Sequence, residues 1–152
     1  MRIEVDQSGK IGDTKVPTVL AFSNGKEKAI LIPATVKRAC LRELRRLRKG
    51  AGIYYPLFAT GLFLLLKDDI ENVDQVTIDV EYRKKDAVIR EHLINLLQRA
   101  GRRVDASQIQ FDLIHRGGKK PRSHDKAYYT YRGELEPDRK ITTAEILREF
   151  HK

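Results

Sequence analysis

The sequence predicts an α/β fold, in which helices flank a five-stranded mixed sheet whose first three strands are antiparallel and whose last two run parallel to the first. Two β-rich runs flank Ser23-Asn24-Gly25-Lys26, and Asn-Gly between such runs favours a hairpin. Later strand-like runs alternate with helical ones, and a strand reached through a helical crossover lies parallel to the earlier strand. A length of 152 residues predicts a single domain over residues 1–152.

The first half of the chain changes from strand-like to helical patterns after Pro33. The turn Gln7-Ser8-Gly9 ends the first predicted strand. The helix after Pro33 is predicted because apolar side chains recur there at helical spacing, and the next helix is apolar nearly all round, which is typical of a buried helix. The expected elements are strands at 1–5, 16–22 and 28–32 and helices at 34–49 and 56–67.

The second half returns to a strand at 76–82, where apolar and polar residues alternate strictly. An amphipathic helix follows at 86–100, then a strand at 109–115. The glycines, the lysines and the proline of 117–123 predict a pliable basic loop. Near the end, Thr142 and Glu145 have the spacing of a capping box, which predicts a short final helix.

Charge and cysteine content narrow the functional classes. Thirty Lys and Arg against 21 Asp and Glu give a net charge of +9, which favours an anionic partner, most often nucleic acid and less often a membrane surface. The single Cys40 excludes an internal disulfide and a multi-cysteine zinc site. The longest apolar run, Leu57 to Leu66, is about half of a bilayer span, and no signal peptide precedes the first strand, so a cytoplasmic protein without a membrane partner is expected.

Two acids lie near the carboxyl ends of predicted parallel strands, Asp6 on the first and Glu81 on the fourth. If these strands are neighbours, their backbones are about 4.8 Å apart, and two such carboxylates repel unless cations lie between them. Two Mg²⁺ or Mn²⁺ ions would remove the repulsion and support phosphodiester hydrolysis. Asp125 is the candidate third ligand, His124 a candidate for proton transfer, and Asp79 an alternative ligand to Glu81.

The antiparallel start, "VDQSG", "TIDVEYR" and the late acid of "SHDKAY" together resemble the ribonuclease H-like nucleases, over most of the chain. The overall pattern is also similar to a single-strand-specific 3′–5′ DNA exonuclease group of hyperthermophilic archaea, and the low Met and absent Trp fit a heat-adapted protein. The resemblance implies that Asp6, Glu81 and Asp125 bind the metal ions. Many family members add a helical Glu after the third strand, and Glu43 is the only candidate for it here.

Two basic segments are candidate nucleic-acid contacts. The first is the exposed face of the helix at 34–49 and the second is the loop before Asp125, where cations would draw phosphates toward the metals. The candidate contacts are Arg38, Arg42, Arg45, Arg116, Lys119, Lys120, Arg122 and Lys126. The expected partner is single-stranded DNA, with RNA as a possibility, and tyrosines near the loop could stack on its bases. A ribonuclease, a junction-cleaving endonuclease, a non-catalytic nucleic-acid-binding module and a basic assembly or scaffold protein are the alternatives, and the hairpin or the apolar second helix could support a homo-oligomer.

Overall fold

A computed structural model covers residues 1–152 and describes all of them except 24–25, 48–50, 80–81, 83, 113–121 and 151–152. Within the described residues the chain forms a mixed sheet of six strands and five α-helices. The strands are β1 (Arg2–Ser8), β2 (Thr18–Ser23), β3 (Lys28–Ile32), β4 (Gln75–Asp79), β5 (Ile109–Asp112) and β6 (Arg139–Lys140). The helices are α1 (Ala34–Leu47), α2 (Tyr54–Leu66), α3 (Asp86–Arg99), α4 (Arg122–Tyr131) and α5 (Thr143–Phe150), and short 3₁₀ turns occupy Ala51–Ile53, Ile70–Asn72 and Ala106–Gln108.

The strand order is β5-β4-β1-β2-β3-β6, with β1 at an inner position. The strands β1, β2 and β3 are antiparallel neighbours, whereas β4 pairs parallel to β1 and β5 parallel to β4, so the predicted directions of the first five strands are confirmed. The sixth strand was not predicted. It contributes only two residues, parallel to β3, and so short a segment has no alternation from which to predict it.

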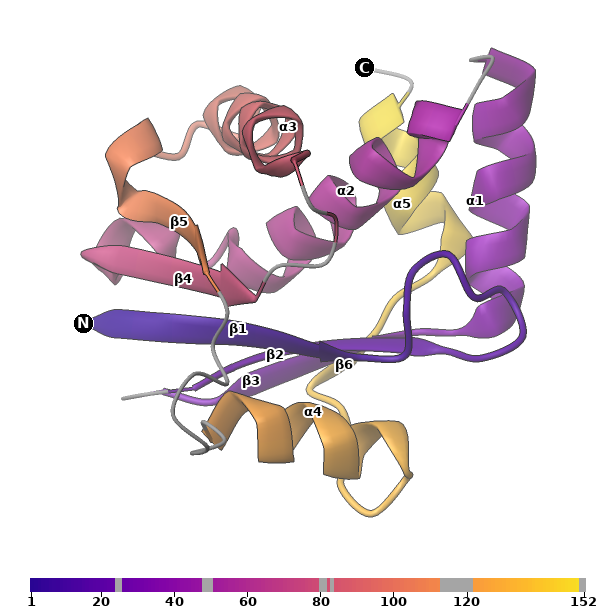
Figure 1. The fold of residues 1–152 in the computed structure, drawn as a ribbon, viewed down its shortest axis with the longest axis horizontal. Coiled ribbons are helices and arrows are strands. Elements are labelled where there is room, and N and C mark those ends of the chain that lie inside the picture. The colour runs from indigo at the N-terminus through magenta and orange to yellow at the C-terminus, as the bar shows by residue number, and fades with distance from the viewer. Residues whose placement is uncertain (24–25, 48–50, 80–81, 83, 113–121, 151–152) are drawn as a thin grey trace.

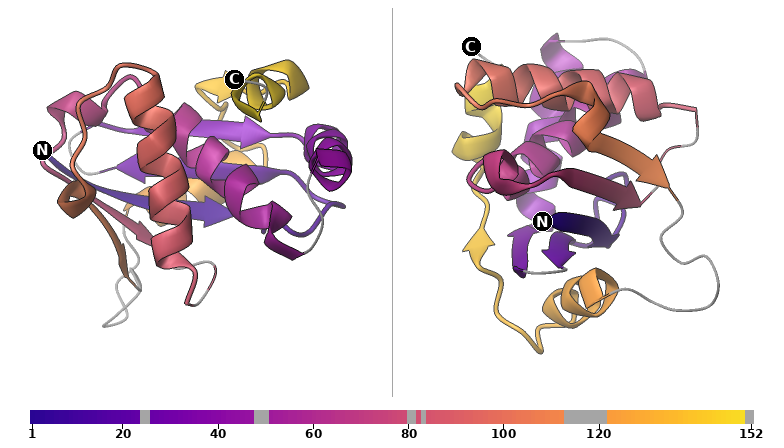
Figure 2. Two further views of the ribbon diagram at one scale, coloured as in Figure 1. Left: turned by 90° about the horizontal axis from the view of Figure 1, so that it is seen from above. Right: turned by 90° about the vertical axis from the view of Figure 1, so that its left-hand side faces the viewer.

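Most of the helices cover one face of the sheet and α4 alone covers the other in the described structure (Figures 1 and 2). The main core lies between the sheet and helices α1, α2, α3 and α5. Helix α2 is buried along nearly its whole length and approaches the sheet closely at Gly61, where an added Cβ would lie 2.9 Å from the Leu20 side chain. No helix in the described part of the chain has the length and apolar composition needed to span a bilayer.

Helix α4 differs from the sequence prediction, because Arg122 and Ser123 belong to this helix and not to the predicted basic loop. Its sequence has few apolar residues, and of its described side chains Ala127 and Tyr131 pack into the small cluster beneath it. The described part of β4 ends at Asp79, earlier than the predicted strand end, and residues 113–121 of the predicted strand and loop lie outside the described residues. The predicted capping box is confirmed, with the Glu145 amide donating to Thr142 Oγ1 at 3.3 Å.

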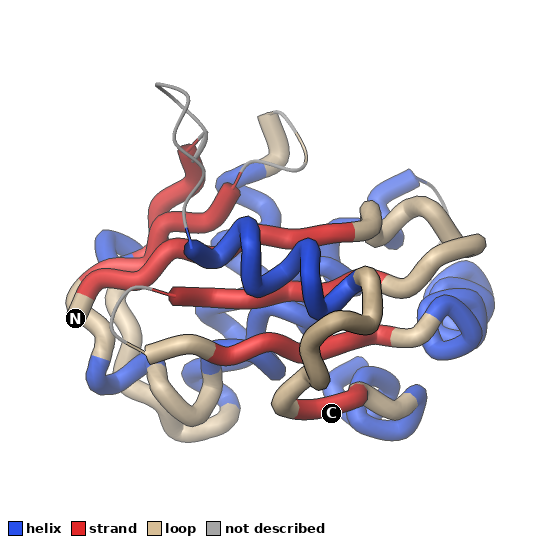
Figure 3. Tube along the Cα trace, turned by 90° about the horizontal axis from the view of Figure 1, so that it is seen from below, coloured by secondary structure: helices blue, strands red, loops and turns tan. Residues whose placement is uncertain are grey.

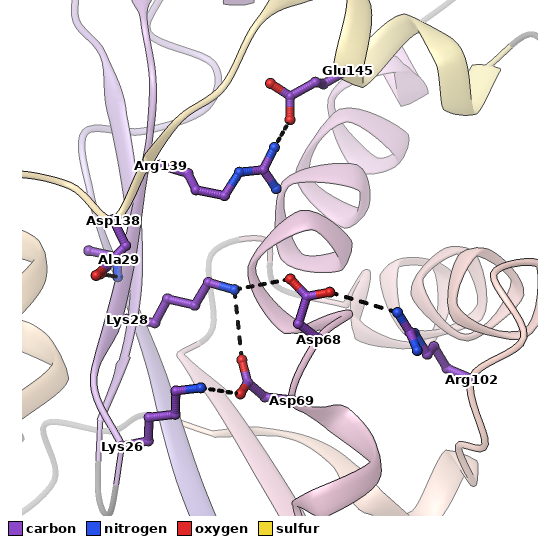
Figure 4. Close-up of polar contacts among 9 residues, drawn as sticks. All are labelled: Lys26, Lys28, Ala29, Asp68, Asp69, Arg102, Asp138, Arg139 and Glu145. Carbon is purple, nitrogen blue, oxygen red and sulfur yellow. Dashed lines mark hydrogen bonds and ion pairs between the residues drawn. The ribbon is translucent and has the colours of Figure 1, made fainter.

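A group of ion pairs ties the β2–β3 hairpin to the end of α2 (Figure 4). Asp68 and Asp69 follow the carboxyl end of α2, where the helix dipole disfavours negative charge. Lys26 Nζ lies 2.7 Å from Asp69, and Lys28 Nζ lies 3.6 Å from Asp68 and 3.7 Å from Asp69. Arg102 approaches Asp68 at 3.7 Å. These cations offset the unfavourable negative charge at the carboxyl end of α2 and hold that end against the β2–β3 hairpin.

Candidate active site

The sheet face that carries α4 is divided into an apolar half and an acidic half. Helix α4 packs on β1, β2 and β3, where small apolar residues such as Ala21 and Ala29 meet Ala127 (Figure 3). On β1, β4 and β5 the side chains that alternate with core residues are polar. They are Arg2, Glu4, Asp6, Ser8, Gln75, Thr77, Asp79, Gln110 and Asp112. A chain with a net charge of +9 therefore gathers four acids on one half of one sheet face.

Asp6 is the most buried of these acids, with only 3% of its side chain exposed. It pairs in register with Ala21, which places its side chain on the face that α4 covers. The Gln7 amide donates to Asp6 Oδ1 at 2.8 Å, and His124 Nδ1 lies 3.0 Å from Asp6 Oδ2. Burying a carboxylate is costly without such partners, and both of its oxygens have one. The structure thus brings two candidate site residues, Asp6 and His124, into contact.

Asp79 lies level with Asp6 on the adjacent strand. Val5 pairs with Ile78 in the parallel register of β1 and β4, so the next residues, Asp6 and Asp79, follow side by side on the same face. Such strands are about 4.8 Å apart. The sequence left Asp79 and Glu81 as alternative ligands. The described geometry aligns Asp79 with Asp6, whereas Glu81 lies outside the described residues.

Asp112 is an acid of this face that the sequence analysis missed. It is the register partner of Asp79 on β5, so three adjacent parallel strands carry aspartates at matched positions near their carboxyl ends. The signal was present, because Ile109 and Phe111 are apolar and Gln110 and Asp112 between them are polar. The sequence predicts this strand over 109–115, and residues 113–115 lie outside the described residues.

His124 and Asp125 are consecutive on α4, and consecutive helical residues point about 100° apart. Asp125 is exposed and lines a surface hollow with Glu27, Lys126 and Tyr129. The nearby Lys126 has its Nζ atom 4.0 Å from Asp138. Asp125 as a metal ligand therefore stays a prediction of the family resemblance, while His124 is the α4 residue in contact with Asp6.

The basic candidates on α1 share one shallow hollow. Exposed Arg38, Arg42 and Arg45 line it together with Thr14 and Leu41. Arg38 donates to the Thr14 carbonyl at 2.7 Å, which ties the arginines to the loop that follows β1. The other helical candidate, Glu43, forms an ion pair with Arg46 on the same helix.

The remaining basic candidates are only partly described. Arg116, Lys119 and Lys120 lie outside the described residues. Arg122 begins α4, but its side chain is outside the described atoms. The predicted phosphate-binding loop before α4 therefore stays a prediction.

The donor chemistry of the acidic half fits a hard divalent cation, because carboxylate oxygens are what Mg²⁺ and Mn²⁺ prefer. Among the described residues, no three His, Cys, Asp or Glu side chains already converge in a metal-binding arrangement. The neighbouring pair Asp6 and Asp79 is the part of the predicted ligand set that the register aligns. No family model, curated protein or solved structure matches this chain.

Proposed function

We propose that the protein is a metal-dependent nuclease of ribonuclease H-like type that hydrolyses single-stranded DNA, with 3′–5′ exonuclease activity. The observation that carries the proposal is the alignment of Asp6 and Asp79 at the carboxyl ends of neighbouring parallel strands, with His124 on Asp6. Ligands in open α/β sheets bind outside the carboxyl ends of strands where the strand order reverses. The strand order reverses here at β1, because β2 and β3 are added on one side of β1 and β4 and β5 on the other. Its two neighbours are antiparallel β2 and parallel β4.

Charge explains why this position suits cations. Two carboxylates on adjacent strands repel, and an anionic nucleic acid would add to that repulsion. Divalent cations held by Asp6 and Asp79 would offset this repulsion and attract a phosphate. Such Mg²⁺ or Mn²⁺ ions would supply activation of water and stabilisation of the leaving oxygen in phosphodiester hydrolysis.

The chain's own residues would then have distinct roles. Asp6 and Asp79 supply carboxylate oxygens, and the contact between His124 Nδ1 and Asp6 Oδ2 fixes the orientation of the Asp6 carboxylate. Glu81 and Asp125 are the further ligands that the family resemblance implies.

Two observations support a nucleic-acid substrate, one from the surface charge and one from the fold. The arginine hollow of α1 offers three exposed guanidinium groups to backbone phosphates, at the loop that leaves the carboxyl end of β1. The strand directions of β1–β5 agree with those that the resemblance to ribonuclease H-like nucleases implies. The preference for DNA and the cleavage polarity follow from that resemblance.

The test is incubation with 5′-labelled and 3′-labelled single-stranded DNA, duplex DNA and RNA, with Mg²⁺, Mn²⁺ or EDTA. We expect metal-dependent shortening of single-stranded DNA from its 3′ end, lost in Asp6→Asn and Asp79→Asn. Asp74→Asn is the matched control, because Asp74 precedes β4 at the opposite end of the strand and has an 80% exposed side chain. Cleavage of RNA or of branched DNA instead would reassign the substrate. Binding without any product would leave a non-catalytic nucleic-acid-binding module.

A further inference from the structure

A ladder of side chains runs along one side of α4, starting at the candidate active site. His124, Tyr128 and Arg132 follow one another at intervals of four residues, which places them on one face. The His124 and Tyr128 rings are parallel within 4°, with centroids 6.2 Å apart. The Arg132 guanidinium lies 5.5 Å from the Tyr128 ring centroid and donates to its hydroxyl at 3.0 Å. The Tyr128 ring is therefore held in a fixed orientation.

This ladder includes aromatic surface that the fold leaves uncovered. Tyr128 is 39% exposed and its neighbour Tyr129 is 42% exposed, and their rings meet edge to face at 5.5 Å. The core packing of α4 is made instead by Ala127 and Tyr131. The two exposed tyrosines thus contribute little to the core and are available to a partner.

The position of the ladder beside the candidate active site indicates which kind of molecule would bind to it. His124, its first member, contacts Asp6, so a molecule lying on Tyr128 is led toward the proposed hydrolytic centre. Arg132 at the far end adds a positive charge, which Glu134 approaches at 3.9 Å, and Glu27, Asp125 and Lys126 line the hollow beside Tyr129. Cations that can approach a phosphate backbone therefore lie on both sides of the two tyrosines.

We propose that Tyr128 and Tyr129 form a base-stacking platform that holds an unpaired nucleic-acid strand beside Asp6. The inference rests on the proposed function, and it identifies what would make the enzyme selective for single strands. Every base has an aromatic face that can stack on tyrosine, but duplex bases are already stacked on one another. The platform therefore binds single strands of any sequence and discriminates against duplexes.

The test is equilibrium binding in EDTA, where no hydrolysis occurs, with fluorescein-labelled oligothymidylate and with the same strand in a duplex. Tyr128→Ala and Tyr129→Ala are each expected to weaken single-strand binding by about 5- to 150-fold, as loss of one base stack does. Duplex affinity is expected to stay unchanged. Tyr128→Phe is the matched control, because it keeps the ring and loses only the hydroxyl, and it should bind as the wild type does. Circular dichroism verifies that each variant is folded.

Equal binding of oligothymidylate by wild type and both alanine variants would overturn the platform, as would equal losses for single strand and duplex. A concentration-dependent dimer that Tyr128→Ala abolishes, with DNA binding intact, would also overturn it and assign the patch to a second copy of the chain. The two proposals fail separately. Normal metal-dependent cleavage by both alanine variants removes the platform alone, whereas selective single-strand binding by a wild type that never cleaves removes hydrolysis alone.

Discussion

Lys37 provides a prediction whose magnitude follows from its contacts. The side chain is fully buried, and its ammonium group donates to the carbonyls of Lys10 at 3.0 Å and Asp13 at 2.6 Å and to Thr18 Oγ1 at 3.0 Å. These bonds attach α1 to the loop that follows Asp6. Lys37→Met keeps the aliphatic stem but leaves three acceptors without this donor.

Each lost bond to a charged donor destabilises by about 1.5 kcal/mol, and removing a buried charge returns about 1–2 kcal/mol. The expected net loss in the free energy of unfolding is therefore about 3 kcal/mol. In urea denaturation this is a shift of about 1.5 M in the midpoint, for a slope near 2 kcal/mol/M, and a fall of about 6–12 °C in Tm.

Lys15→Met is the matched control, because Lys15 is an exposed lysine of the same loop. Its unfolding free energy should change by less than about 0.5 kcal/mol. A Lys37→Met protein within 1 kcal/mol of the wild type, on the order of ordinary surface changes, would refute the idea that these three bonds hold the loop.

Three further predictions follow from single features. Gly9 has φ +80°, and an added Cβ would lie 2.1 Å from the Pro17 carbonyl oxygen, so Gly9→Ala should lower the unfolding free energy by at least about 2 kcal/mol in urea denaturation; near-wild-type stability would contradict the described turn. Replacing Arg38, Arg42 and Arg45 together by Gln should reduce the magnitude of the slope of log K against log[salt] for single-stranded DNA by up to about 2, because each phosphate contact contributes about 0.7 to that slope. An unchanged slope would remove the α1 hollow from the interface. Burial raises the pKa of the Cys40 thiol to about 12, so a thiol reagent at pH 8 should label the protein only once urea unfolds it. The folded state should also lose stability as pH rises from the unfolded thiol's pKa near 9 toward 12. Rapid labelling of the folded protein would show that the thiol is accessible.

The sheet could be predicted from sequence because its signals are local. Alternation identified β4, the turn residues after Phe22 identified the β2–β3 hairpin, and the crossover rule gave the parallel directions. The burial of α2 also followed directly from its composition. Helix α4 could not be predicted in the same way, because its formation depends on the small apolar patch of β2 and β3 that Ala127 covers, a tertiary contact rather than a sequence pattern.

The sequence singled out two residues of the candidate site that are in contact, but it did not give the arrangement of the others. Asp6 was identified because an acid ends an apolar strand, and His124 because it lies beside an acid in the late segment, and the two are in contact. Whether Asp79 or Glu81 lies level with Asp6 depends on the register between β4 and β1. The alternation of residues within one strand does not specify its register with a strand reached through a helical crossover. Asp125 and His124 are inseparable in sequence, and only the helix that contains them shows that they point in different directions.

The central claim is that Asp6 and Asp79 together hold divalent cations. Titration of the wild-type protein with Mn²⁺, followed by isothermal calorimetry, measures this without any assumption about substrate. We expect saturable binding that weakens at least about tenfold in Asp6→Asn and in Asp79→Asn and is unchanged in Asp74→Asn. A wild type that binds no Mn²⁺, or an Asp79→Asn protein that binds it as tightly as the wild type, would contradict the claim.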